Sequence, residues 1–494
     1  MIDCVAHPMA PTEDFQEKRW LALILLCSAQ FVVVLDASIV NVALPSIGKA
    51  LDFSQENLPW VVNAYVLTFG GFLLLGGRTA DLLGRRRVFM AGLLLVAVAS
   101  LFAGFAATEG QLIAARAAQG LGAAIISPAA LSIVTTTFKD GAERNKALGV
   151  WGAVAGSGGA AGVLLGGVLT DGLGWEWVLW VNVPVALIAF ALSPRLIAES
   201  RAEAQTRAFD IAGAVTVTAA LSILVYALVD ANDAGWGSSQ TIGLIALSIL
   251  LMASFVAIEL RSAKPLVPFS IFRIRTLTGA NVVGLLVGAS LFSMFFFISL
   301  YMQQVLGYSA IHAGLSYLPL ALVIMASAGI ASQLVTKLGY KPVLAAGLLF
   351  IVIGLTWFSR VSVGGSFTTD ILGPSLFAAA GLGFSFVTTT IAAVSGVEEN
   401  EAGLASGLIN TSQQIGGALG LAVLSAVAIS RTNDVTTGAS PSLSGLTEGF
   451  QAAFLGGAAF ALLGFVLTLV LIRGSDSRAH VALGKEEAAD AASA

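Results

Sequence analysis

The sequence predicts an all-α integral membrane protein with fourteen transmembrane helices, arranged as two six-helix halves with an inserted helix pair between them. Three observations lead to this prediction. The 494 residues are 57% hydrophobic and 11% charged, with a mean hydropathy of +0.88, which leaves too little polar surface to coat a water-soluble core. Apolar runs of about 20 residues recur, each long enough to cross about 30 Å of hydrocarbon as a helix. Finally, basic residues are unevenly shared between alternate loops.

The predicted helices follow directly from the apolar runs, which are separated by short polar or glycine-containing segments. In chain order they cover residues 21–45, 58–77, 87–107, 111–138, 145–169, 177–195, 209–229, 240–260, 278–301, 312–336, 341–361, 370–394, 402–430 and 450–473.

The placement of Lys and Arg predicts the orientation of these helices. If the N-terminus is cytoplasmic, 21 of the 25 basic residues fall in inner loops and tails, and only Lys49, Arg360 and Arg431 fall in outer loops. Basic residues favour the cytoplasmic side of a membrane, and a missed helix would invert every later loop. We therefore expect an even number of crossings and cytoplasmic termini.

The order of the spans divides the chain into five parts. We predict a cytoplasmic tail (1–19), a first six-helix half (20–195), an inserted two-helix segment with cytoplasmic linkers (196–277), a second six-helix half (278–473) and a disordered cytoplasmic tail (474–494).

A weak internal repeat supports the two halves. The string LLGRRRVF has a counterpart in KLGYKPVL, which aligns Gly84 with Gly339. In the same alignment Asp81 corresponds to Thr336. A second repeat aligns Gly120 and Gly122 with Gly381 and Gly383, and thereby Arg116 with Phe377, so the charged side chains of these motifs occur in the first half only. Repeated halves around a central site are typical of alternating-access transporters. We expect proton handling in the first half and more of the apolar substrate surface in the second.

Asp36 is the only charge in the first span, within FVVVLDASIVNVALP. A carboxylate near the bilayer centre costs roughly 2.5 to 3.5 kcal/mol on insertion scales, so its presence indicates a function, most simply the handling of protons or cations. Arg116 is a second buried charge, in span four. At 1.5 Å per residue, Asp36 lies about 24 Å from the inner end of its span and Arg116 about 8 Å from the outer end, which gives similar depths. Alternatively, Arg116 snorkels to the outer headgroups.

The loop after span two, GGRTADLLGRRRVF, combines glycines, a carboxylate and a cationic cluster. It can be a generic basic inner loop, but its spacing resembles the signature G-x-L-A-D-x-x-G-R-K of the major facilitator superfamily. Thr79 and Leu82 depart from the pattern, which is matched at Gly77, Ala80, Asp81, Gly84, Arg85 and Arg86.

Two further motifs resemble the same superfamily. Span four matches R-x-x-Q-G-x-G, a position associated there with proton transfer, at Arg116, Gln119, Gly120 and Gly122. Span five resembles the glycine motif associated with exporters, with Val163 in place of its proline. Close helix packing alone can also explain these glycines. They are Gly149, Gly158, Gly162, Gly166 and Gly167.

The run LDASIVNVALP resembles the first helix of the fourteen-helix drug:proton antiporters, and the likeness extends over essentially the whole chain. The resemblance implies a multi-pass transporter of the bacterial cytoplasmic membrane. Polar and aromatic side chains that could face its cavity could equally make helix-to-helix hydrogen bonds or face lipid. The candidate cavity residues are Asp36, Asn41, Asn63, Phe295, Tyr317, Asn410, Gln413 and Gln414.

Enzymatic chemistry is poorly supported. The three histidines are scattered, so they predict no metal triad, and Cys4 and Cys27 predict neither a disulfide nor a metal site. No phosphate-binding loop for ATP occurs in the sequence.

We therefore predict a monomeric exporter of amphipathic, drug-like compounds. It would be driven by the proton gradient without a cofactor, and its partners would be the substrate, protons and the lipid bilayer, with no nucleic acid. The alternatives are a proton-coupled symporter, an exporter of a single metabolite, or, from another class, a non-transporting membrane sensor or intramembrane enzyme.

Overall fold

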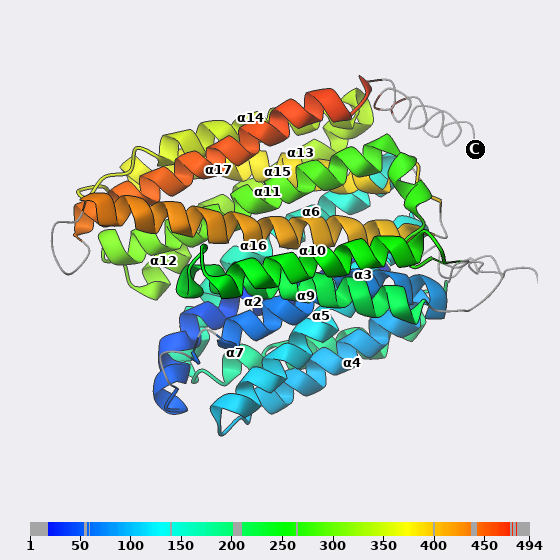
Figure 1. Cartoon of the computed structure of the whole chain (residues 1–494), viewed down its shortest axis with the longest axis horizontal. Helices are drawn as coiled ribbons and strands as arrows, with labels where there is room; N and C mark the ends of the chain where they lie inside the picture. Colours follow the sequence, from blue (N-terminus) through cyan, green and yellow to red (C-terminus); the bar gives the residue numbers. More distant parts are fainter. Residues whose placement is uncertain are drawn as a thin grey trace, which may run out of the picture.

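A computed structural model describes residues 18–53, 57–58, 60–138, 141–200, 210–262, 265–398, 401–435, 442–474, 477 and 481. Every regular element in these residues is a helix, and the long helices lie side by side in one bundle (Figure 1). The chain is therefore all-α, as its composition predicts.

The described residues of the first half form seven helical segments. Its sixth predicted span is divided, because a turn at Val181 separates a short helix from the longer one that follows. The segments are α2 (Arg19–Ala50), α3 (Trp60–Leu83), α4 (Arg85–Gly104), α5 (Glu109–Thr137), α6 (Ala142–Gly172), α7 (Trp177–Trp180) and α8 (Asn182–Leu196).

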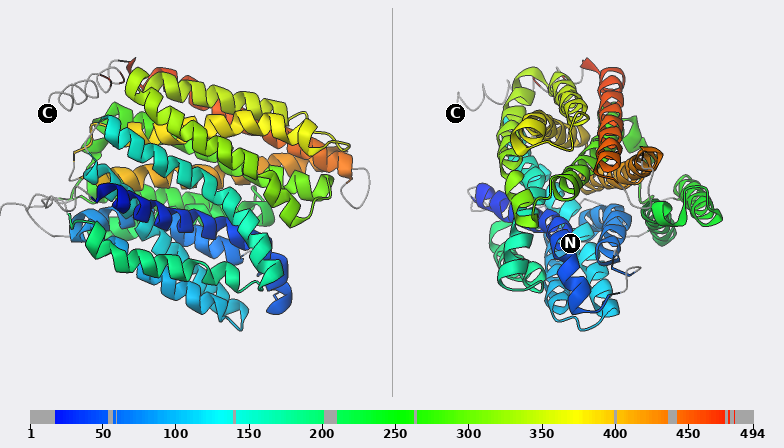
Figure 2. Two further views of the ribbon diagram at one scale, coloured as in Figure 1. Left: turned by 180° about the vertical axis from the view of Figure 1, so that it is seen from behind. Right: turned by 90° about the vertical axis from the view of Figure 1, so that its left-hand side faces the viewer.

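The inserted segment forms a helix pair, α9 (Ile211–Ala234) and α10 (Ser239–Glu259), followed by a short 3-10 helix η1 (Phe269–Arg273). The pair stands to one side of the other helices in the end-on view (Figure 2). Helix α9 packs against α3 and α16, whereas α10 packs mainly against α9. The insertion therefore extends the bundle without lying between the halves.

The second half repeats the pattern with more interruptions, including two π-helical turns. Its elements are α11 (Arg275–Leu300), η2 (Tyr301–Val305), α12 (Ala310–Ser316), α13 (Leu318–Leu338), α14 (Tyr340–Phe358), η3 (Phe367–Leu372), α15 (Gly373–Val394), α16 (Ala402–Val435) and α17 (Leu443–Leu471).

The number of membrane spans is close to the predicted fourteen but is not fixed at that value. Twelve helices among the described residues are long and apolar enough to cross a membrane. A bent pair within α6, Ala142–Gly159 and Ala161–Gly172, raises the number to 13. Helix α9 contains only a shorter apolar stretch, Ala212–Leu228. The chain is thus a multi-pass membrane protein. Length and apolarity alone do not decide whether α6 and α9 each cross the membrane.

Gly84 and Gly339 occupy matching places in the two halves. Gly84 precedes α4 with a φ of 109°, and Gly339 precedes α14 with a φ of 82°. Both values lie in the left-handed region that side chains disfavour, which explains why glycine stands at each turn. We call the end of the bundle that contains these two glycines the motif end.

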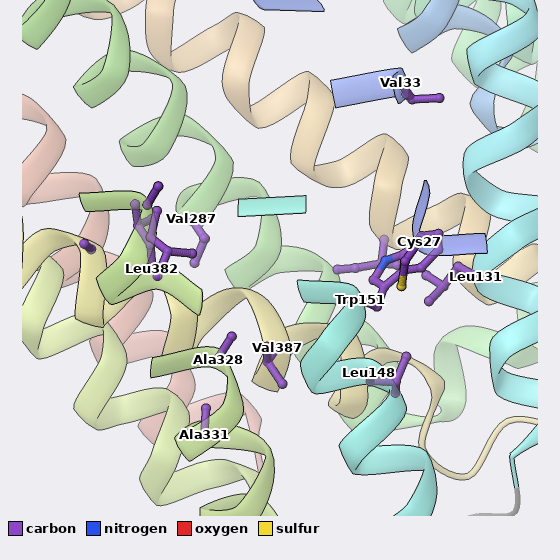
Figure 3. Packing of buried hydrophobic residues seen from close by; sticks show 14 of the residues in the cluster. Cys27, Val33, Leu131, Leu148, Trp151, Val287, Ala328, Ala331, Leu382 and Val387 are labelled. Carbon is purple, nitrogen blue, oxygen red and sulfur yellow. The ribbon is translucent and has the colours of Figure 1, made fainter. Parts of the chain in front are cut away.

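Two helices join the halves. Helix α6 of the first half packs against α12, α13 and α15, and α16 of the second half packs against α3 and α5. The apolar core continues across this boundary. In Figure 3, Cys27, Leu131 and Trp151 lie close together, and they come from α2, α5 and α6. Helix α6 thus contacts both the helix of Asp36 and the second half.

The ends of the chain differ slightly from the prediction. Helix α2 begins at Arg19, one residue before the predicted first half. Ser477, within the segment predicted as a disordered tail, is buried, and its Oγ accepts a hydrogen bond from Lys341 N at 3.2 Å. It thereby serves an otherwise unpaired amide in the first turn of α14. The other residues of both predicted tails lie outside the described part of the chain, except Lys18, Arg19, Gly474 and Val481.

Candidate functional site: a buried carboxylate and its partners

Asp36 lies in the middle of α2 and is only 2% exposed. Its Oδ2 is 2.7 Å from Nη1 of Arg116, which is fully buried on α5. The two residues are 80 positions apart in sequence, and their contact agrees with the similar depths expected from helix geometry. The structure therefore contains a buried charge pair within the first half.

The guanidinium of Arg116 is held on several sides. Its Nε donates to the carbonyl of Val61 at 2.9 Å, and its Nη1 also donates to Oε1 of Gln119 at 2.9 Å. The ring of Tyr65 lies 4.5 Å from the guanidinium carbon. These contacts use the planar donors of arginine and its affinity for aromatic faces. The alternative in which Arg116 snorkels to the headgroups does not describe this arrangement.

Two amides complete the surroundings of the carboxylate. Nε2 of Gln119 donates to Asp36 Oδ1 at 3.3 Å and to Ser100 Oγ at 2.7 Å. Nδ2 of Asn182 donates to the same Oδ1 at 2.5 Å. Asn182 is the first residue of α8, directly after the turn that separates α7 from α8. Sequence reasoning missed Asn182 and Ser100; the signal for Asn182 was a single amide within the apolar run WVLWVNVP.

Asp36 accepts hydrogen bonds from one cation and two amides. A buried ion pair needs such hydrogen bonds to offset the cost of removing it from water. Protonation would cancel the charge and weaken the attraction to Arg116. The ion pair and these hydrogen bonds hold α2 against α5 and α8.

The glycines of α6 form the surface on which the helix of Asp36 rests. A Cβ added at Gly158 would lie 2.9 Å from the side chain of Val34, and one at Gly166 would lie 2.7 Å from the carbonyl of Ile39. Gly162 faces Ser38 and the carbonyl of Leu35. These three positions let α2 and α6 approach closely.

The other two glycines of this motif contact the second half. Gly149 faces Ser332 on α13, and Gly167 faces Ile311 on α12. The three middle glycines of the motif thus lie against α2, and Gly149 and Gly167 lie against the second half.

We predict that Gly162→Ala destabilises the protein. The new Cβ would overlap Ser38 Oγ and lie 3.0 Å from the Leu35 carbonyl. Overpacking of this kind costs about 1 to 3 kcal/mol. The measurement is the thermal unfolding of purified protein, with Gly159→Ala as the matched control, because nothing lies within 4 Å of a Cβ there. Ser38→Ala should partly rescue Gly162→Ala; equal stability of the two glycine variants would contradict the close contact.

Asp81 joins the two halves at the motif end. Its Oδ1 accepts from Arg85 Nη2 at 2.9 Å and from the backbone N of Gly403 at 3.0 Å, and its Oδ2 accepts from Leu404 N at 2.9 Å. These amides belong to the first turn of α16, whose N-terminal dipole favours a carboxylate. A Cβ at Gly77 would overlap the carbonyl of Gly403, so this glycine permits the close approach of α3 to α16.

Basic residues in the first turn of α4 bind a segment that the sequence suggested only as a linker. Backbone N of Arg86 donates to Glu199 Oε1 at 3.2 Å, and its Nη1 donates to the carbonyl of Ile197 at 3.0 Å. Backbone N of Arg85 donates to the carbonyl of Ser200 at 2.9 Å. At the same end, burial raises the pKa of the Glu401 carboxyl, and the neighbouring Glu398 adds to this effect.

The remaining candidate cavity residues do not gather around Asp36. Asn41, one turn away on α2, donates to Ala37 O at 3.4 Å. Asn410 on α16 accepts from Ser127 Oγ of the first half at 3.4 Å. The neighbouring Gln413 is buried against α11. Among the described residues, the half-buried Asn63 and Gln414 make no side-chain hydrogen bond, so their role stays a prediction.

Tyr317 and Phe295 contact each other instead of a central site. The hydroxyl of Tyr317 donates to the Phe295 carbonyl at 2.8 Å, and the ring centroids are 5.7 Å apart. Tyr317 is buried, so its hydroxyl makes the helix-to-helix hydrogen bond that was the alternative to a place in the cavity. Gly120, of the span-four motif, packs against the backbone of Tyr65 on α3.

The described residues hold no group of three or more His, Cys, Asp or Glu side chains that could bind a metal ion.

Comparison with known proteins identifies membrane transporters, which agrees with the bundle of long apolar helices. The model of the Major Facilitator Superfamily matches residues 26–421. The cephamycin export protein CmcT of Amycolatopsis lactamdurans is 41% identical over 453 residues, 91% of this chain and 92% of the relative. The puromycin resistance protein pur8 of Streptomyces alboniger is 37% identical over 488 residues, 97% of this chain and 96% of the relative.

A solved structure shows the same fold at low identity. The proton:xylose symporter XylE bound to 6-bromo-6-deoxy-D-glucose superposes with a TM-score of 0.65 at 12% identity, covering 92% of this chain and 96% of the symporter. The family match and the two relatives identify a transporter and not an enzyme, which confirms the resemblance found in the motifs. The chain belongs to the major facilitator superfamily.

Proposed function

We propose that this protein exports an amphipathic, drug-like or antibiotic compound in exchange for protons, with Asp36 as the proton carrier. The observation that carries the proposal is the buried Asp36–Arg116 pair, because an ionisable pair inside a membrane protein is costly and typical of proton pathways. Relatives whose names describe export of cephamycin and resistance to puromycin support the direction of transport. No cofactor is needed, since the proton gradient supplies the energy.

The mechanism follows from what protonation does to the pair. A proton from outside neutralises Asp36, which removes its attraction to Arg116 and changes the hydrogen bonds that hold α2 to α5 and α8. Because the glycine face of α6 contacts both α2 and the second half, a shift of α2 reaches the boundary between the halves. Release of the proton to the inside restores the pair. Movement of one charge through 100 mV supplies about 2.3 kcal/mol, enough for roughly a 40-fold gradient.

We further propose fourteen crossings of a bacterial cytoplasmic membrane, with both termini and the motif end inside and the protein a monomer. This count adds α6 and α9 to the twelve long apolar helices. A cysteine at Gly237, between α9 and α10, tests it, because nothing lies within 4 Å of that position. It should react with an impermeant reagent from outside, whereas a cysteine at Lys341 should not. Labelling of position 237 only from inside would remove the inserted pair from the spans.

Transport into inverted membrane vesicles tests the proposed function. An acid lumen should drive accumulation of a fluorescent amphipathic substrate, or of puromycin, inside the vesicles. Accumulation above that in vesicles without the protein indicates an exporter that exchanges substrate for protons, because an acid lumen also traps weak bases passively. Loss of substrate from preloaded vesicles would indicate a symporter, and binding without movement would indicate a sensor.

We predict that Asp81→Ala shifts the protein towards states that are open at the motif end. The variant loses the acceptor for Gly403 N and Leu404 N, and hydrogen bonds to a charged group are worth about 1.5 to 3 kcal/mol each. A single cysteine at the boundary residue Ser127 should therefore react faster, while substrate affinity of the competent state stays nearly unchanged.

Asp210→Ala is the matched control for this experiment. Asp210 also accepts from the first turn of a helix, through Gly213 N at 2.7 Å, but within the inserted segment. It should leave the reactivity at position 127 unaltered. Normal export of Asp81→Ala with unchanged reactivity would show that the Asp81 contact does not hold the halves together.

A further inference from the structure

We propose that Asn182 reports the protonation state of Asp36 by reversing its side-chain amide. When Asp36 is ionised, Asn182 donates a hydrogen bond to it through Nδ2; when Asp36 is protonated, its O–H donates a hydrogen bond to Asn182 Oδ1. The inference rests on the proposed function in one respect, namely that Asp36 takes up a proton. It assigns to α8 a role in sensing that event.

The contacts of Asp36 indicate which of its oxygens takes the proton. Oδ2 faces the Arg116 guanidinium at 2.7 Å, and a proton there would point at a cation. Oδ1 faces the two amides of Gln119 and Asn182 instead. A proton on Oδ1 turns an acceptor into a donor, so one of these amides must then offer its oxygen.

Gln119 cannot make that change without losing other bonds. Its Oε1 accepts from Arg116 Nη1 at 2.9 Å, and its Nε2 donates to Ser100 Oγ at 2.7 Å, so both ends of the amide are in use. Asn182 differs, because its buried Oδ1 has no hydrogen-bond partner. A half-turn about its Cβ–Cγ bond brings this oxygen to Asp36 and moves Nδ2 into the unpartnered place. The reversal therefore breaks no other bond made by the amide.

Among the groups around Asp36, Asn182 is the one whose hydrogen bond reverses when Asp36 takes up a proton. The charged and titratable groups that face the carboxyl are Arg116 on α5 and Tyr65 on α3, whose hydroxyl donates to Val33 O at 2.9 Å. Helix α6 presents glycines to α2 at this level. Proton uptake removes the negative charge of Asp36 and turns Oδ1 into a hydrogen-bond donor. The amide of Asn182, at the start of α8, passes that change to a separate helix.

Isotope-edited infrared difference spectroscopy tests the reversal in the purified full-length protein. Asparagine carries a ¹³C label at its side-chain carbonyl, and spectra in alkaline and acidic buffer are compared. We expect a protonated carboxyl band that is absent from Asp36→Asn. With the same pH dependence, we expect a shift of one labelled amide band that is absent from Asn182→Thr.

Threonine and valine at position 182 form a matched pair of equal shape. The threonine hydroxyl can donate or accept by rotation, whereas valine can do neither. The Asp36 carboxyl band should therefore keep the frequency of a hydrogen-bonded acid in Asn182→Thr and move to that of a carboxyl with a weaker bond in Asn182→Val.

Three results would contradict either the reversal of the Asn182 amide or the proton-carrier role of Asp36, and they distinguish between the two. A carboxyl band without a shift of the amide band in the unmodified protein would overturn the reversal and leave the proposed function intact. An Asp36 carboxyl band that is the same in the valine variant would also overturn the reversal. Absence of any Asp36 carboxyl band across the pH range would overturn the proton-carrier role itself, and with it the proposed function.

Discussion

Asp36→Asn is expected to abolish proton-driven export. The asparagine cannot exchange a proton, so an acid lumen should no longer drive substrate into inverted vesicles. The concentration ratio that one charge can support, roughly 40-fold per 100 mV, should fall to about 1. The measurement is accumulation of a fluorescent substrate, with passive exchange followed in the same vesicles without a gradient. Export at the unmodified rate would mean that another residue carries the proton.

The structure adds a control that the sequence does not suggest. Loss of a buried charge alone predicts a variant that folds and inserts readily, but Asp36→Asn leaves Arg116 buried without its counter-charge. Removal of one partner from a buried pair costs about 3 to 5 kcal/mol. The double variant Asp36→Asn/Arg116→Gln removes both charges and should recover much of the lost thermal stability, yet remain unable to couple export to protons.

Arg116→Gln is expected to move the pH profile of substrate binding upward. The guanidinium stays charged at any relevant pH and favours the ionised carboxylate 2.7 Å away. Without this neighbouring positive charge, Asp36 should keep its proton to higher pH. The measurement is the binding of a fluorescent cationic substrate to purified protein across a series of pH values.

Two variants make this result specific. Arg116→Lys restores the charge but lacks the forked donors that reach Val61 O and Gln119, so it should recover only part of the activity. Asp36→Asn should flatten the pH profile. An identical midpoint in Arg116→Gln and the unmodified protein would show that the two charges are uncoupled and that Arg116 serves packing alone.

Much of the architecture could be predicted because a bilayer restricts it. Spans follow from apolar length, and the depths of Asp36 and Arg116 follow from the rise of a helix, which is why their contact could be expected from residues 80 positions apart. The positive φ of Gly84 and Gly339 agrees with the weak repeat between the halves. The exact number of spans could not be settled in this way, because α6 is bent and α9 has a short apolar stretch.

The sequence by itself determined the class of protein from its apolar runs, and it singled out Asp36, Arg116 and Asp81 because each is a charge in or beside an apolar run. Only the tertiary structure decided which groups complete the sites. Asn182, Ser100 and Glu199 come from helices and linkers far from their partners in sequence, and a lone amide or hydroxyl in a helix gives no sign of its direction. The same holds for Tyr317, whose hydroxyl turns to a backbone carbonyl because helix packing, which periodicity does not encode, places that carbonyl within reach.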